Sequence, residues 1–144
     1  MRVLAIDYGT KRVGIAVSDP TGIIAQPLEF ILAEPADKFW SRLDSILKEK
    51  EVGRIIVGMP RNMDGSFGPA AQRVEGFVGE LRAKGPIPVQ TLDERLTTRQ
   101  AERVLIQGNT RREKRKEKID QTAAAILLQS YLDSQAALGS EEGL

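Results

Sequence analysis

The chain has 144 residues, which is enough for one domain with its own hydrophobic core and too few for a second catalytic lobe. Hydrophobic residues make up 41% of the sequence and charged residues 28%, the formal net charge is +1, and no apolar run approaches the roughly 18 residues of a membrane-spanning helix. Cysteine and histidine are both absent, which excludes thiolate nucleophiles, Ser-His-Asp triads and Cys/His zinc sites. Carboxylates, Lys, Ser, Thr, Tyr and backbone amides remain for chemistry, and carboxylates with water are the ligands that suit Mg²⁺ or Mn²⁺.

The first part of the chain predicts three strands. Residues 2–8 are mostly apolar and end at a Gly-Thr turn, and residues 12–18 alternate in hydrophobicity, so the two segments predict a hairpin. Residues 23–31 form a third extended segment, and Pro27 within it predicts an edge strand, because proline has no N–H to donate to a neighbouring strand. Since Asp7 interrupts the apolar start of the chain, we interpret this start as a strand rather than a targeting segment and expect a cytoplasmic protein.

Helices and strands alternate in the middle of the chain. Apolar residues at helical spacing predict one helix from Pro35 to about Lys50 and another around residues 74–81. Between them, residues 54–60 form a short apolar run that is typical of a strand covered on both faces. Residues 88–94 predict a further strand.

Two helices, with a basic segment between them, are predicted for the last third of the chain. Thr97 and Gln100 form a capping box for a helix that ends at Gly108-Asn109. Residues 111–118 hold six basic and two acidic side chains, a pattern that fits either contacts to nucleic-acid phosphates or a solvated helix face. The last helix is predicted from about Lys118, with an inner face made of Ile119, Ala123, Ile126, Leu127 and Tyr131.

This order of elements predicts a single α/β domain over residues 1–138, followed by a frayed tail at residues 139–144. A hairpin side and a parallel side joined by crossover helices imply one five-stranded mixed sheet in the order 3-2-1-4-5, flanked by helices. In open sheets of this kind, ligands bind at the carboxyl ends of the parallel strands. The ends of the first, fourth and fifth strands are therefore expected to form the rim of a binding site.

Three acidic residues are predicted to meet at this rim. Asp7 lies near the end of the first strand, Glu94 ends the last strand, and Asp120 opens the final helix. Carboxylates a few Å apart repel one another unless a cation joins them, so their convergence indicates a metal site. Each also has an ordinary alternative: Asp7 suits a turn, Glu94 can pair with Arg95 or Arg99, and Asp120 suits the first turn of a helix.

Two other segments at the rim can contact an anion. Arg61 and Ser66 lie in a loop that follows the fourth strand, although Asn, Asp and Gly are also ordinary turn formers there. Thr97 and Thr98 lie at a predicted helix N-terminus, where they either cap the helix or approach a phosphate. Both segments are weaker indicators than the three acids.

Four motifs closely resemble the YqgF family of pre-16S rRNA nucleases, also described as Holliday-junction-resolvase-like proteins. They are DYGTKRVG from Asp7, GMPRNMDG from Gly58, DERLTT from Asp93 and KIDQTAA from Lys118, and the resemblance extends to about Leu132. It implies a ribonuclease-H-like fold, a bacterial cytoplasmic protein, and a role in processing the 5′ end of the 16S rRNA precursor during ribosome assembly. Its partner would be pre-rRNA or, as for junction resolvases, branched DNA.

The resemblance also implies a catalytic site. Asp7, Glu94 and Asp120 match acidic positions of the family and would bind two Mg²⁺ or Mn²⁺ ions about 4 Å apart, with Asp7 bridging them. Resolvases of this fold use four acids, so either Asp64 or Asp93 is a candidate for a further ligand. The nucleic-acid backbone would be contacted by Lys11, Arg12, Arg61, Arg95, Arg111, Arg112, Lys114, Arg115, Lys116 and Lys118.

Two other functions compete with a nuclease. The Asp-x-Gly-Thr sequence at Asp7 also follows the first strand of sugar kinases and actin-like ATPases, but those proteins close two lobes around ATP and this chain has room for one. The second competitor is a nucleic-acid-binding module whose acids are structural. The basic segment supports that interpretation as well as it supports catalysis.

Overall fold

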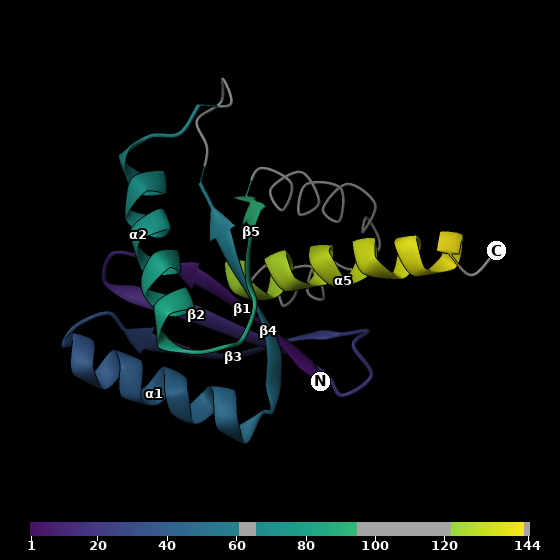
Figure 1. The fold of residues 1–144 in the computed structure, drawn as a ribbon, viewed down its shortest axis with the longest axis horizontal. Coiled ribbons are helices and arrows are strands. Elements are labelled where there is room, and N and C mark those ends of the chain that lie inside the picture. Colours follow the sequence, from purple (N-terminus) through teal and green to yellow (C-terminus); the bar gives the residue numbers. More distant parts are fainter. Residues whose placement is uncertain (61–65, 95–121, 143–144) are drawn as a thin grey trace, which may run out of the picture.

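The computed structural model describes residues 1–60, 66–94 and 122–142, which contain the five predicted strands. The strands are β1 (Arg2–Tyr8), β2 (Arg12–Ser18), β3 (Ala25–Leu32), β4 (Val52–Met59) and β5 (Val89–Asp93). They form one sheet in the order β3-β2-β1-β4-β5, which confirms the predicted topology (Figure 1). β1 to β3 pair antiparallel, and β4 pairs parallel with both β1 and β5, so β1, β4 and β5 end at one rim.

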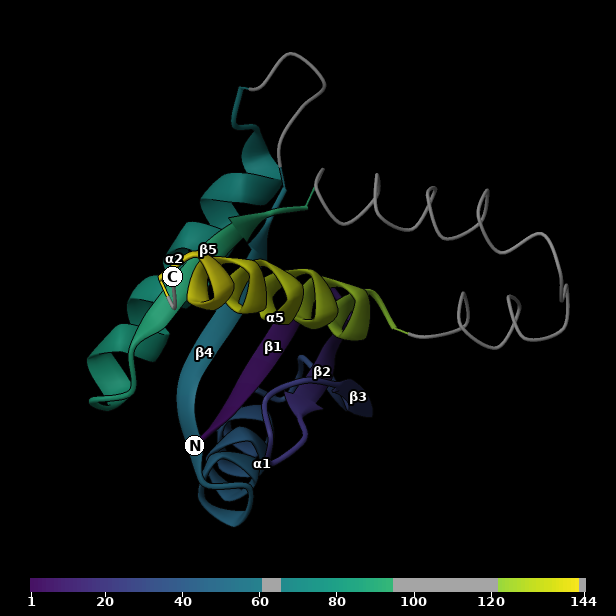
Figure 2. The ribbon, with the colours of Figure 1, turned by 90° about the vertical axis from the view of Figure 1, so that its right-hand side faces the viewer.

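Helices cover both faces of this sheet. α1 (Ala36–Glu49) and α2 (Pro69–Lys84) pack on one face, and α5 (Ala123–Glu142) crosses the other (Figure 2). In the parts of the chain that the structure describes, no helix combines the length and the apolar character needed to cross a membrane.

The two hydrophobic cores follow from strand alternation. Successive side chains of a strand point to opposite faces, so Leu4 and Ile6 of β1 pack under α1 and α2, whereas Ala5 packs under α5. The small side chains of Ala5 and Ala16 let α5 approach the sheet closely. Asp7 has the same parity as Ala5, and it therefore faces the α5 side of the sheet.

The edge strand β3 contains the predicted proline. Pro27 lies opposite Ala16, and the register between β2 and β3 shifts between Ile15 and Ala16, so one residue of β3 is left unpaired there. Two residues further along, Glu29 accepts hydrogen bonds of 2.6 and 3.0 Å from the guanidinium of Arg42 on α1. This contact lowers the pKa of Glu29 and joins the edge strand to α1.

Helix α5 begins later than the sequence predicted. The predicted start near Lys118 is wrong for this helix, because Thr122 is not helical and its side-chain oxygen accepts a 3.2 Å hydrogen bond from the N–H of Ala125. Such a cap fixes the first helical residue at Ala123. The helix also continues to Glu142, through the start of the segment for which a frayed tail was predicted.

The inner face of α5 differs slightly from the predicted one. Leu127 and Tyr131 are buried, as predicted, and Ile126 is half-buried. Ala123 was predicted to face inward but is exposed, because it lies in the first turn, ahead of the buried stripe. That stripe consists of Ala124, Ala125, Leu127, Leu128, Tyr131 and Leu132.

Candidate active site

Asp7 is placed by β1 at the rim where the parallel strands end. It pairs with Gly14 of β2 and is half-buried on the α5 face of the sheet. Because Gly14 has no side chain, the space beside Asp7 on β2 is open to a neighbour from further along the sheet. The carboxylate is thus fixed by the central strand, at the position that the sequence predicted.

Glu94 reaches Asp7 from the other side. It follows β5 directly, and its side chain lies over Gly58 of β4, where an added Cβ would come within 2.9 Å of Glu94 Oε1 and 3.0 Å of its Cγ. The same Cβ would lie 3.3 Å from the Leu127 side chain of α5. A glycine at this position therefore makes room for Glu94 between β4 and α5.

The electrostatics of Glu94 show that the two carboxyl groups are in contact. Burial raises the pKa of Glu94 most, followed by the charge of Asp7, a side-chain hydrogen bond with Asp7 and the charge of Asp93. A hydrogen bond between two carboxyl groups needs a proton on one of them, and because the pKa of Glu94 is raised, Glu94 holds its proton to a higher pH than an isolated carboxyl group does when no cation is present. A divalent cation can replace that proton.

Asp93 lies on the other side of the sheet from this pair. It pairs with Met59, which belongs to the core under α1 and α2, whereas its neighbour Leu92 packs against the α5 core. Because successive side chains alternate between the two faces of a sheet, Glu94 lies on the same face as Leu92, and Asp93 lies on the same face as Met59. Asp93 therefore acts on the site through its charge, and the geometry favours it less than Asp7 and Glu94 as a metal ligand.

The cationic residues of the first turn lie at the same rim. Lys11 and Arg12 are exposed, and the Arg12 guanidinium stacks 4.5 Å from the centroid of the Phe30 ring on β3. Sequence reasoning gave no role to Phe30, which carries no motif of its own. Glycines inside apolar strands, at positions 14 and 58, were the available signal that something approaches the sheet closely there.

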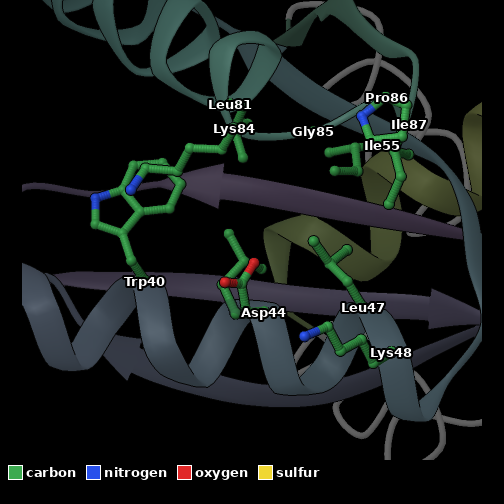
Figure 3. A pocket seen from close by; sticks show the side chains of 11 residues that line it. Trp40, Asp44, Leu47, Lys48, Ile55, Leu81, Lys84, Gly85, Pro86 and Ile87 are labelled. Atoms are coloured by element: carbon green, nitrogen blue, oxygen red, sulfur yellow. The ribbon is translucent and has the colours of Figure 1, made fainter.

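A cavity of about 210 Å³ lies on the opposite face, between α1 and α2 (Figure 3). Trp40 and Leu47 of α1 and Leu81 of α2 line it, and Lys84 lies over the Trp40 ring at 4.3 Å from its centroid. Since Asp7 and Glu94 face α5, this cavity is separated from them by the sheet.

Comparison with known proteins identifies the family of this chain. A family model described as "RuvX: Holliday junction resolvase" matches residues 1–134. The chain belongs to the RuvX family. This confirms the resemblance to YqgF proteins seen in the sequence, and it places the chain among nucleases, which are hydrolases.

Close relatives of this RuvX-family chain carry the name "Putative pre-16S rRNA nuclease". One from Thermoanaerobacter pseudethanolicus is 48% identical over 136 residues, covering 94% of this chain and 98% of the relative. One from Desulforamulus reducens is 46% identical over 136 residues, covering 94% and 99%. One from Pelotomaculum thermopropionicum is 43% identical over 144 residues, covering 99% of this chain and 94% of the relative.

A solved structure confirms the fold of the RuvX-family chain. Thermus thermophilus RuvC, in complex with a Holliday junction substrate, superposes with a TM-score of 0.60 over 95% of this chain and 96% of that chain, at 14% sequence identity. The predicted ribonuclease-H-like class is thus confirmed. At this identity the likeness concerns the fold alone.

Several predicted site residues of the RuvX-family chain lie outside the described residues. The same is true of the helix predicted over residues 97–109, and of Ile119, which was predicted for the inner face of the last helix. Within residues 1–60, 66–94 and 122–142, no group of three acidic side chains is arranged to hold a metal ion. The structure brings together two of the three predicted acids, Asp7 and Glu94. The site residues that it does not describe are Asp120, Asp64, Arg61, Arg95, Arg111, Arg112, Lys114, Arg115, Lys116 and Lys118.

Replacing Glu94 with Gln is expected to stabilise the RuvX-family chain when divalent ions are absent. Because the pKa of Glu94 is raised in the fold, the folded chain binds more protons than the unfolded chain between the ordinary carboxyl pKa of 4.5 and the raised value. The free energy of unfolding of the wild type therefore falls as the pH rises through that range. Glutamine carries no charge and therefore avoids this fall in the free energy of unfolding. The gain in the free energy of unfolding should stay below about 1 kcal/mol, because solvent screens a half-buried pair.

Thermal unfolding in EDTA, measured below and above that pH range, checks this expectation. Glu94→Gln should unfold at a higher temperature than the wild type only above the range. Glu75→Gln, on the exposed side of α2, is the matched control and should show no such difference. A Glu94→Gln variant that is less stable than the wild type at the higher pH would contradict the proposed electrostatics.

Proposed function

We propose that this chain is a divalent-metal-dependent endonuclease that cleaves structured RNA and processes the 5′ end of the 16S rRNA precursor in the cytoplasm. The activity would reside in the single domain over residues 1–138. One observation carries the proposal: Asp7 and Glu94, brought from β1 and the end of β5, contact each other at the rim where the parallel strands end. The names of the relatives support the choice of substrate.

The residues present fit Mg²⁺ or Mn²⁺. Both ions prefer carboxylate oxygens, and such a cation would relieve a half-buried glutamate whose pKa is raised by burial and by the neighbouring Asp7. Asp7, Glu94 and, from the sequence, Asp120 would hold the metal. When bound, it would supply Lewis-acid activation of water and stabilise the leaving 3′ oxygen.

The protein's own side chains have positioning roles in this mechanism. Glu94 would give up its proton on loading, and Asp7 and Glu94 would then stay fixed by β1 and by the space over Gly58. Lys11 and Arg12 are exposed at the rim and would contact phosphates next to the scissile bond. From the sequence, Arg95 would also contact phosphates near the scissile bond, and the basic residues of segment 111–118 would bind the strand further away, with Arg61 as another phosphate contact. Because these are phosphate contacts, selectivity would come from RNA shape.

A resolvase is the second candidate, because the matching family model carries that description. The experiment that separates the candidates is cleavage of two end-labelled substrates, a 16S precursor RNA fragment and a four-way DNA junction, with Mg²⁺, Mn²⁺ or EDTA. The proposal expects metal-dependent cleavage of the RNA. Cleavage of the junction alone would favour the resolvase, and binding of either substrate without cleavage would favour a nucleic-acid-binding module.

A further inference from the structure

An aromatic ring lies beside the carboxylate pair, in a row that crosses three strands. Asp7 pairs with Gly14, and Gly14 pairs with Phe30, so the three residues lie side by side on β1, β2 and β3. A Cβ added to Gly14 would lie 3.3 Å from Phe30 Cε1 and 3.7 Å from Asp7 Cβ. The edge of the ring and Asp7 Cβ are therefore no more than about 7 Å apart, which is about the rise of two nucleotides along a strand.

This ring is accessible. Phe30 is 49% exposed and Leu32, which follows it on the same face, is 69% exposed. The core under α5 includes Ala16 and Ala25, at the other end of β2 and β3, and it does not include Phe30. The residues that the structure describes thus leave an apolar surface uncovered at the rim where the carboxylates lie.

A cation accompanies this apolar surface. The Arg12 guanidinium lies 4.5 Å from the centroid of the Phe30 ring, and Leu32 is the strand partner of Arg12. Nucleobases stack on aromatic rings and on guanidinium planes, and the guanidinium also attracts the phosphate attached to the base. A ring with a cation on it, beside a pair of carboxylates, matches the chemistry of a nucleotide better than that of a purely apolar partner.

We propose that Phe30 and Arg12 form a platform that stacks one unpaired base of the RNA, in the nucleotide next to the scissile phosphate. This inference rests on the proposed nuclease function and adds a substrate requirement to it. A base inside a helix is stacked and paired, and it cannot reach a ring on the sheet surface. The platform therefore selects a single-stranded or bulged nucleotide at the cleavage position, without reading its sequence.

The wild type and three variants test the platform. Phe30→Ala should raise KM for the precursor RNA about tenfold, as expected from the loss of one stacked base on an aromatic ring. Phe30→Trp should restore most of the affinity, because it restores an aromatic face. Ile24→Ala, which truncates another exposed apolar side chain just before the start of β3, should behave like the wild type.

A modified RNA substrate provides a second test of the platform. Removing the base from the nucleotide next to the cleavage site should raise KM of the wild type by a similar factor, and Phe30→Ala should then add no further loss. The proposal is overturned if Phe30→Ala leaves KM unchanged on the intact RNA, or if it weakens cleavage of intact and abasic RNA equally. Circular dichroism of each variant confirms that the fold is kept.

A binding measurement keeps the two proposals distinguishable. Single-stranded RNA that carries one 2-aminopurine should lose fluorescence on binding to the wild type and to Phe30→Trp, because stacking quenches this base, and should lose less with Phe30→Ala. If the wild type quenches the base but cleaves no RNA, the nuclease proposal fails and the platform stands. If the wild type cleaves RNA and quenching is the same for all variants, the platform fails and the nuclease proposal stands.

Discussion

Asp7→Asn is expected to lower the cleavage rate of precursor RNA by roughly 10³-fold, the scale that follows the loss of a principal electrostatic contact to a transition state. Asp7 is fixed by the central strand and contacts Glu94. Asparagine keeps the shape and can donate a hydrogen bond to Glu94, so the fold should survive. The carboxylate that would hold the metal is lost.

The measurement is single-turnover cleavage at saturating Mg²⁺ or Mn²⁺, together with the affinity for the same RNA. Asp7→Asn should bind RNA at least as well as the wild type, because the change removes a negative charge from the binding rim. Asp44→Asn, which changes an exposed aspartate on α1, should cleave normally. Full cleavage by Asp7→Asn would show that the acids at the rim are structural.

Gly58→Ala has the second largest expected effect. The new Cβ would lie 2.9–3.0 Å from atoms of Glu94 and 3.3 Å from Leu127, so the Glu94 side chain would have to shift to make room. Glu94 should therefore shift away from Asp7, and a misplacement of about 1 Å at a reacting site costs about 10²-fold in rate. Crowding of this kind is also expected to lower the free energy of unfolding by about 1–3 kcal/mol.

Gly53→Ala is the matched control for this change. It lies on the same strand, and its new Cβ would meet only the side chain of Met1, which is fully exposed and can move aside. Shortening the displaced acid in the double variant Gly58→Ala, Glu94→Asp should recover part of the lost rate. Gly58→Ala activity within twofold of the wild type would mean that the space over Gly58 does not position Glu94.

The sheet and one pair of acids could be predicted from the sequence for simple physical reasons. Proline has no N–H to donate, so Pro27 identified β3 as the edge strand. The change from strand to helical periodicity predicted the crossover helices between the parallel strands, and these crossovers set the strand order. With that order, the ends of β1 and β5 share a rim. The contact between Asp7 and Glu94 follows from the topology alone.

The aromatic platform could not be predicted in the same way. Whether Phe30 lies beside Gly14 depends on the register between β2 and β3, and a shift of one residue would turn its ring to the other face. The shift next to Pro27 sets that register, and hydrophobic alternation does not reveal it. The space over Gly58 was similarly hidden, because it depends on how α5 brings Leu127 near β4.

The edge strand β3 also limits how two copies of this chain can join. Exposed sheet edges tend to pair with one another, and natural proteins block this with prolines, bulges and inward-pointing charges. β3 has all three: Pro27, the register shift opposite it, and Glu29 held against Arg42. A junction resolvase must cut two strands in a symmetric way, and such a pair of subunits would have to associate through a surface other than the β3 edge of the sheet.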